Sequence, residues 1–139
     1  MQEINCFSLE GHTGEYETWP LRSRLFRGGT VLPLTLPGYS LLRQYATVEG
    51  YLLVTDYDCP YEEETNFILV DKDCKRILGE RSFGTPYASW FLEDLFWHDD
   101  RRFTAIISGT PISFKIRSFY IPYLYPKIGI VKEAFEFEP

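Results

Sequence analysis

The chain has 139 residues, of which 45% are hydrophobic, 24% charged and 17% aromatic, and its formal net charge is −6. This length fits one domain with a real core, and the supply of apolar and ring side chains excludes a largely disordered chain. The negative charge argues against nucleic-acid binding, because that affinity comes largely from Lys and Arg contacts with phosphates. We therefore predict a single folded domain over residues 1–139 without a nucleic-acid partner.

The sequence lacks the marks of a secreted or membrane protein. No apolar run approaches the roughly 18 residues that a membrane span needs, and the opening MQEINCFSLEG has neither the basic start nor the apolar stretch of a signal peptide. The three cysteines show none of the spacings that prearrange a metal or redox pair. We expect a cytoplasmic protein with reduced thiols, no membrane association, no cofactor and no bound metal.

The first third of the chain reads as short extended segments. Residues 3–9 (EINCFSL) and 16–19 (YETW) have the composition of two strands, separated by the turn signal GHTG. Residues 30–37 (TVLPLTLP) contain two prolines, which cannot donate to a central ladder. This segment is predicted to be an edge strand or an extended crossing.

The middle of the chain carries three apolar runs at short intervals. They are residues 51–57 (YLLVTDY), 66–72 (NFILVDK) and 75–81 (KRILGER), all rich in residues that favour strands. Their spacing predicts a β-meander with a tight polar turn between the last two runs. Cys74 lies in that turn, where Gly or Asn would adopt a positive φ more easily.

One helix is predicted, over residues 86–97. Thr85 can cap the first free N–H groups, and Pro86 suits the first helical position. The apolar residues that follow fall at i, i+1, i+4 and i+5, which places them on one helical face; they are Phe91, Leu92, Leu95 and Phe96. We expect this face to pack on the sheet.

The last third returns to a period of two. Residues 103–108 (FTAIIS) and 111–119 (PISFKIRSF) predict a hairpin, and residues 128–138 (IGIVKEAFEFE) predict a final strand with Phe135 and Phe137 inward. The fold class is therefore mainly β (α+β), an antiparallel sheet or a small sandwich or barrel of about seven to nine strands, with the one helix packed on it.

The segment 56–64, DYDCPYEEE, is the most unusual stretch. It does not fit a calcium hand, because three of the five required positions have the wrong residue type. Its carboxylates would attract a cationic surface, and tyrosines are common anchors at interfaces. The predicted partner-binding residues are Asp56, Tyr57, Asp58, Tyr61, Glu62, Glu63 and Glu64, with Asp99 and Asp100 as a second acidic patch. A looser cation site, a solvated turn and internal pairing with Arg22, Arg24 and Arg27 remain open.

Two other functions stay open as well. In WHDDRR, residues 97–102, His98 stands beside Asp99 and Asp100, a combination that could serve a small hydrolase or isomerase, although no nucleophile motif accompanies it. The tryptophans Trp19, Trp90 and Trp97 would suit a ligand- or carbohydrate-binding β module if their rings faced solvent, but such rings more often belong to a core.

The combination of size, acidity, free cysteines, missing catalytic motifs and a compact β-rich fold is typical of the small cytosolic immunity proteins that neutralise bacterial toxins. This resemblance is one of kind and rests on no shared motif. Our leading hypothesis is accordingly a non-enzymatic binding protein that blocks a basic protein partner. The sequence leaves its oligomeric state undetermined.

Overall fold

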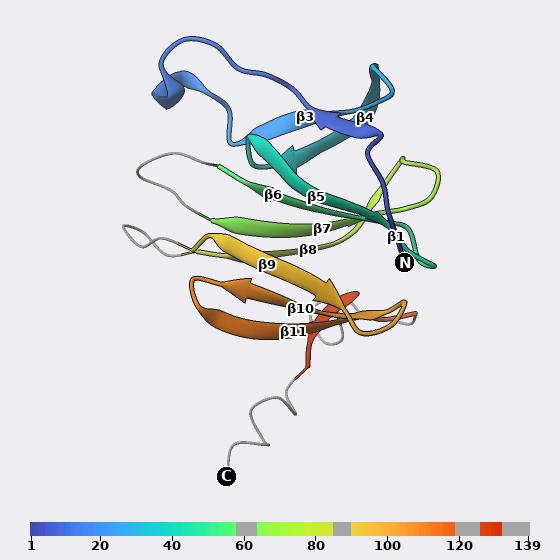
Figure 1. The fold of residues 1–139 in the computed structure, drawn as a ribbon. Helices are drawn as coiled ribbons and strands as arrows, with labels where there is room; N and C mark the ends of the chain where they lie inside the picture. The colour runs from blue at the N-terminus through green and yellow to red at the C-terminus, as the bar shows by residue number, and fades with distance from the viewer. Residues whose placement is uncertain (58–63, 85–89, 119–125, 132–139) are drawn as a thin grey trace.

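A computed structural model describes residues 1–57, 64–84, 90–118 and 126–131. They form a mainly β, antiparallel fold, as predicted, and its strands are arranged in three sheets. The sheets are stacked in layers (Figure 1). The described residues contain twelve strands instead of seven to nine, and one short 3₁₀ helix, η1. The elements are β1 (Gln2–Glu3), β2 (Phe7–Leu9), η1 (Tyr16–Thr18), β3 (Arg22–Arg27), β4 (Thr30–Pro37), β5 (Ser40–Ala46), β6 (Tyr51–Asp56), β7 (Thr65–Val70), β8 (Ile77–Phe83), β9 (Leu92–Trp97), β10 (Arg102–Ile107), β11 (Thr110–Ile116) and β12 (Ile128–Ile130).

The middle layer is a five-stranded sheet with the strand order β1-β5-β6-β7-β8. Strands β5 to β8 follow one another as neighbours, which confirms the predicted meander. All six residues of β7 are buried, and so are the four central residues of β6. A strand that is covered on both faces reads as a continuous apolar run instead of an alternating one. This burial explains the runs YLLV and FILV.

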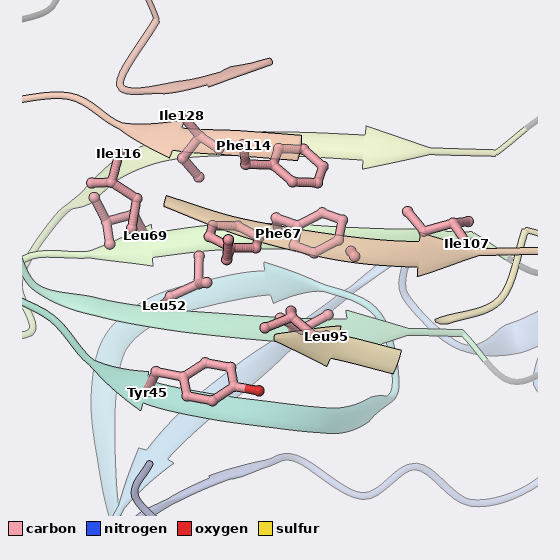
Figure 2. Packing of buried hydrophobic residues seen from close by; sticks show 12 residues of the cluster. Tyr45, Leu52, Phe67, Leu69, Leu95, Ile107, Phe114, Ile116 and Ile128 are labelled. Carbon is pink, nitrogen blue, oxygen red and sulfur yellow. The ribbon is translucent and has the colours of Figure 1, made fainter. Parts of the chain in front are cut away.

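The first core lies between the middle sheet and the four-stranded sheet, whose order is β12-β11-β10-β9. Phe67 of the middle sheet contacts Phe103 and Phe114 of the outer sheet, with ring centroids 5.9 and 4.7 Å apart. Figure 2 shows Leu52 and Leu69 pointing into the same layer. Aromatic pairs at these separations stabilise by more than their buried area alone.

The second core lies between the opposite face of the middle sheet and the three-stranded sheet, whose order is β2-β3-β4. Leu53 and Ile68 of the middle sheet pack with Leu25 and Leu36 of the outer sheet, and all four side chains have no exposed surface. Strand β4, the proline-containing segment, forms an edge of this sheet as predicted.

Each outer sheet contains a hairpin whose two turn residues both have positive φ angles. The predicted hairpin β10–β11 is confirmed, and its two turn residues, Ser108 and Gly109, have φ angles of 49° and 83°. The β3–β4 hairpin turns through Gly28 and Gly29 at 58° and 83°. Positive φ at both central residues is the geometry whose twist matches that of the flanking strands. The meander turn likewise holds Cys74 at a φ of 59°, a value that glycine or asparagine adopts more easily.

The predicted helix over 86–97 is wrong where the structure describes it. Residues 92–97 form strand β9, and residues 85–89 lie outside the described part of the chain. The register against β10 shifts between Ile106 and Ile107, which pair with Asp94 and Leu92, so the β9 strand contains an additional residue there. This bulge places the inward residues Leu92 and Leu95 three positions apart, a spacing that imitates a helix.

Three other segments differ from the prediction. Residues 16–18 form η1 instead of a strand. The expected strand over 3–9 is divided into β1 and β2, because the chain passes from the middle sheet to the three-stranded sheet between them. The final strand is present as β12, whereas Phe135 and Phe137 lie outside the described residues.

One partly buried ion-pair group ties the middle layer to the four-stranded sheet. The Glu49 carboxylate, in the β5–β6 turn, accepts hydrogen bonds from Arg101 Nη2 and Lys127 Nζ, each at 2.7 Å. Hydrogen bonding from Lys127, and then from Arg101, holds the pKa of Glu49 below its usual value. The Lys127 side chain is only 5% exposed, so this carboxylate compensates a buried charge.

Candidate functional site

The acidic segment 56–64 connects β6 to β7, whose residues Asp56 and Thr65 are paired. Of the predicted partner-binding residues in this segment, Asp56, Tyr57 and Glu64 are described, and Asp56 and Glu64 are partly exposed. Asp58, Tyr61, Glu62 and Glu63 lie outside the described residues, so their predicted role stays a prediction. The structure therefore fixes the two ends of the segment.

Tyr57 is buried at the start of this segment, with 7% of its surface exposed. Its hydroxyl donates a hydrogen bond of 3.0 Å to the carbonyl oxygen of Leu21. Its ring packs edge-on against Tyr39 at 5.0 Å. Tyr57 therefore anchors the segment to a neighbouring connection, and its ring faces the protein instead of the solvent.

Tyr57 belongs to a group of four rings that we call the ring cluster: His12, Trp19, Tyr39 and Tyr57. Tyr39 contacts Trp19 at 5.1 Å and His12 at 5.3 Å, and those two rings are 5.3 Å apart. The rings come from three separate connections of the chain, and the mutual edge-on and tilted contacts are favourable geometries. The cluster joins connection 10–21 to the β4–β5 and β6–β7 connections.

Hydrogen bonds fix the ring cluster in place. Ser23 Oγ donates to the carbonyl oxygen of Gly38 at 2.6 Å and lies 2.9 Å from His12 Nε2. Because the single hydroxyl proton goes to Gly38, His12 Nε2 donates to Ser23. Trp19 Nε1 donates to the carbonyl oxygen of Thr13 at 3.0 Å. The imidazole of His12 thus serves as a structural donor at this nitrogen.

A row of hydrogen-bonded polar groups crosses the middle sheet from the β4–β5 connection. Thr55 and Asn66 are buried, and Ser82 is its exposed end. Thr55 Oγ1 donates to the carbonyl oxygen of Pro37 at 2.5 Å and accepts from Asn66 Nδ2 at 3.2 Å. Asn66 Oδ1 in turn accepts from Ser82 Oγ at 2.7 Å. Buried polar groups with satisfied partners favour one arrangement of the strands over its alternatives.

Connection 10–21, which meets Tyr57, is itself acidic. It contains Glu10, Glu15 and Glu17 and no Lys or Arg. Glu15 and Glu17 are exposed, whereas Glu10 binds Arg24, and the backbone N–H of Arg24 holds the pKa of Glu10 below its usual value. Figure 1 shows η1 and the described ends of the β6–β7 connection at the same end of the stacked sheets. We call connection 10–21 and segment 56–64 together the acidic end.

The cluster of three arginines in β3 does not pair with segment 56–64 in the described part of the chain. Arg22 Nη2 is 2.9 Å from Glu80 Oε2, and Arg24 binds Glu10. The Arg27 guanidinium lies over the rings of Phe7 and Tyr51, at 5.5 and 5.0 Å from their centroids. The alternative in which these arginines compensate the described residues of segment 56–64 is thus not supported.

The second predicted patch, Asp99 and Asp100, lies next to cations of the chain itself. Asp99 Oδ1 accepts from the backbone N–H groups of Arg101 and Arg102, both at 2.8 Å, and Oδ2 pairs with the Arg102 guanidinium. The backbone N–H of Arg101, followed by the Arg102 side chain, lowers the pKa of Asp99. Asp100 pairs with the amino group of Met1. This region carries mixed charge, unlike the acidic end.

His98, the residue on which the enzymatic alternative depends, is exposed beside β9. Its Nε2 lies 2.7 Å from Thr104 Oγ1, which lies 3.0 Å from Ser113 Oγ. Within the described chain neither Asp99 nor Asp100 contacts the imidazole. These three residues are consecutive in the sequence, but the structure does not assemble them into an acid–base pair.

The three tryptophans are all partly buried, and two contribute to the first core. Trp90 and Trp97 pack against that core, and Trp97 contacts Phe103 at 4.8 Å. Trp19 belongs to the ring cluster. Among the residues that the structure describes, none of the tryptophans therefore presents the open ring face that a sugar-binding platform requires.

Within residues 1–57, 64–84, 90–118 and 126–131, no group of three or more His, Cys, Asp and Glu side chains is arranged to hold a metal ion. The cation site left open by the sequence would use Asp56, Asp58, Glu62, Glu63 and Glu64. Three of these residues, Asp58, Glu62 and Glu63, lie outside the described ranges, so this site stays a prediction. In the same ranges no helix has the length and apolar character needed to cross a membrane.

Comparison with known proteins adds no relative. No protein family model matches this chain, and no curated protein or solved structure is significantly similar to it.

Proposed function

We propose that this chain is a non-enzymatic, cytoplasmic binding protein that blocks a basic protein partner through its acidic end, in the way that small immunity proteins neutralise toxins. The observation that carries the proposal is the Tyr57–Leu21 hydrogen bond of 3.0 Å. It joins two acidic connections that are distant in the sequence. This contact supports the proposal that the carboxylates of both connections meet the same partner surface.

The charge distribution supports this use. The two connections contain eight of the 20 Asp and Glu residues and none of the 14 Lys and Arg residues. The rest of the chain therefore has 12 acidic residues against 14 basic ones, so the whole negative excess belongs to the acidic end. A field of one sign concentrated in one region steers a partner of opposite charge and raises its association rate.

The scaffold suits binding better than catalysis. The nitrogen Nε2 of each histidine is engaged with a hydroxyl group, and the acids beside His98 bind cations and backbone N–H groups instead. The filled cores and the fixed ring cluster give a rigid support for the acidic end. A rigid support lowers the conformational cost of binding.

The test compares three forms of the full chain as bait in the cells that produce it. The first is the wild type, the second carries Glu62→Lys, Glu63→Lys and Glu64→Lys, and the third carries three reversals outside the acidic end as a matched control. The control positions are the exposed residues Glu3, Asp73 and Asp94. Both variants change the net charge equally, so a difference between them reports the position of the charge.

We expect a basic protein to be captured by the wild type and the control but lost with the segment variant. Once purified, this protein should lose its activity on addition of the wild type. Its association rate should fall as ionic strength rises, less steeply with the segment variant, because fewer charges then steer the encounter. Equal capture and equal rates for the two variants, or a partner that is acidic, would contradict the proposal.

A further inference from the structure

An exposed apolar segment, which we call the protrusion, lies within the acidic end. It consists of Trp19, Pro20 and Leu21, which lie between η1 and β3. Leu21 is 63% exposed, the highest value among the large hydrophobic residues in the described chain, and the other large exposed ones lie between 40 and 48%. Single exposed leucines are common on protein surfaces. An exposed leucine among acidic residues is less common and calls for an explanation.

The protein holds this protrusion rigidly. Tyr57 donates to the Leu21 carbonyl oxygen, the Trp19 amide donates to the carbonyl oxygen of Tyr16 at 3.0 Å, and the Trp19 indole donates to Thr13. These contacts fix the backbone on both sides of Pro20, whose own φ is restricted by its ring. A partner would therefore meet a preformed apolar contact, which costs little ordering entropy.

The charges around the protrusion indicate which kind of surface it can contact. Glu15 and Glu17 are exposed in the same connection, and Tyr57, at the other side, begins the acidic segment. The nearest cation in sequence, Arg22, is paired with Glu80. An anionic membrane surface and a second copy of this chain would both be repelled by these carboxylates, whereas a surface bearing Lys and Arg would be attracted.

We infer that the Trp19–Leu21 protrusion docks into an apolar site that is flanked by Lys or Arg on the partner, with Glu15 and Glu17 facing those cations. This inference rests on the proposed function and specifies its contact. An apolar centre with a polar, solvent-accessible rim is the usual arrangement of a protein interface. The acids then set the encounter rate, and Leu21 prolongs the complex.

The experiment uses two synthetic peptides as probes. One is a 14-residue amphipathic helix of Lys and Leu, and the other has the same lysines with Ser in place of every Leu. Dissociation constants are measured by titration against the wild-type chain, with the Leu21 methyl signals followed by NMR. We expect the Leu peptide to bind about tenfold more tightly, which is the scale expected for one buried leucine.

The variant Leu21→Ser should abolish this tenfold preference while retaining salt-dependent binding of both peptides. The matched control Val31→Ser removes a residue that is 48% exposed at the opposite end of β3–β4, and it should keep the preference. A leucine preference that survives Leu21→Ser, or no preference in the wild type, would overturn the docking inference alone. Failure of both peptides to bind the wild type would overturn the proposed function as well.

Discussion

Tyr57 and Leu21, which are 36 positions apart in the chain, are joined by a hydrogen bond from the phenol hydroxyl to the backbone carbonyl oxygen. Tyr57 begins the acidic segment after β6, and Leu21 is the last residue before β3. One buried side chain thus positions both the exposed leucine and the start of the acidic segment. The contribution of this contact to stability can be measured.

Replacing Tyr57 with Phe removes the hydrogen bond but keeps the ring that packs on Tyr39. We expect the free energy of unfolding, measured with urea, to fall by about 1 kcal/mol, the usual net value of such a bond. The control is Tyr51→Phe, whose hydroxyl accepts from Arg27 at an exposed position, and it should cost less. Equal losses in the two variants would show that the Leu21 contact contributes nothing special.

Replacing Glu49 with Gln removes the carboxylate that compensates Lys127. We expect a loss of about 2–3 kcal/mol at pH 7, because a buried ammonium then loses the carboxylate that bonds it at 2.7 Å. The half-exposed pair Arg22–Glu80 provides the control, and Glu80→Gln should cost under about 1 kcal/mol. Urea unfolding of both variants measures the difference.

The same pair of variants predicts a pH dependence. The pKa of Glu49 is lowered in the folded protein, so its contribution is complete above the unfolded value of about 4.5 and is lost as the pH falls through the lower folded value. The stability of Glu49→Gln relative to the wild type should therefore be lowest near neutral pH and recover in acid. A difference that stayed constant between pH 7 and pH 3 would count against this account.

Replacing Gly38 with Ala should be severely destabilising. Its φ is +111°, and an added Cβ would lie 2.6 Å from Thr55 Oγ1, the hydroxyl that bonds Pro37. We expect a loss of about 2–3 kcal/mol from strain and displacement. Gly11→Ala is the control, because nothing lies within 4 Å of its added Cβ, and it should change stability by less than about 0.5 kcal/mol.

The β10–β11 turn offers a stabilising change. Ser108 has a φ of 49°, and Asn-Gly suits this turn better than Ser-Gly. The Asn side chain also retains an acceptor for the Phe91 N–H, which Ser108 Oγ now accepts. We expect Ser108→Asn to raise the free energy of unfolding by about 0.5–1 kcal/mol. In calorimetry, Gly109→Ala should shift the midpoint in the opposite direction, because its φ is +83°.

The sequence predicts those parts of the fold in which local pattern and tertiary role agree. Three features show this agreement: the buried runs of β6 and β7, the two-residue period of β10 and β11, and the prolines of β4. Each reflects how one strand is buried or where it lies in its sheet. β9 could not be predicted in this way, because one additional residue in the strand gave Leu92 and Leu95 a helical spacing. Its pairing with β10 outweighs local preference, and pairing is not visible in the segment itself.

The candidate site could also be predicted from the sequence only in part. The acidity of residues 56–64 is plain from composition, but its junction with connection 10–21 is not. His12 and Tyr39 were missed as members of the ring cluster, since the four rings come from positions that share no motif and meet only after three sheets have formed. Asp99 and Asp100 look like a patch in the sequence, whereas their charges are compensated by Arg102 and Met1 in the structure.

The middle sheet has a consequence for how the chain tolerates change. Leu52 and Leu53 are adjacent, yet each belongs to a different core, and Phe67 and Ile68 are divided in the same way. Consecutive positions therefore pack against opposite outer sheets. A shift of either strand by one residue would move its side chains from each core into the other. Such an arrangement leaves no room for gradual repacking, and it makes the meander the part of the molecule in which inherited variation should be most restricted.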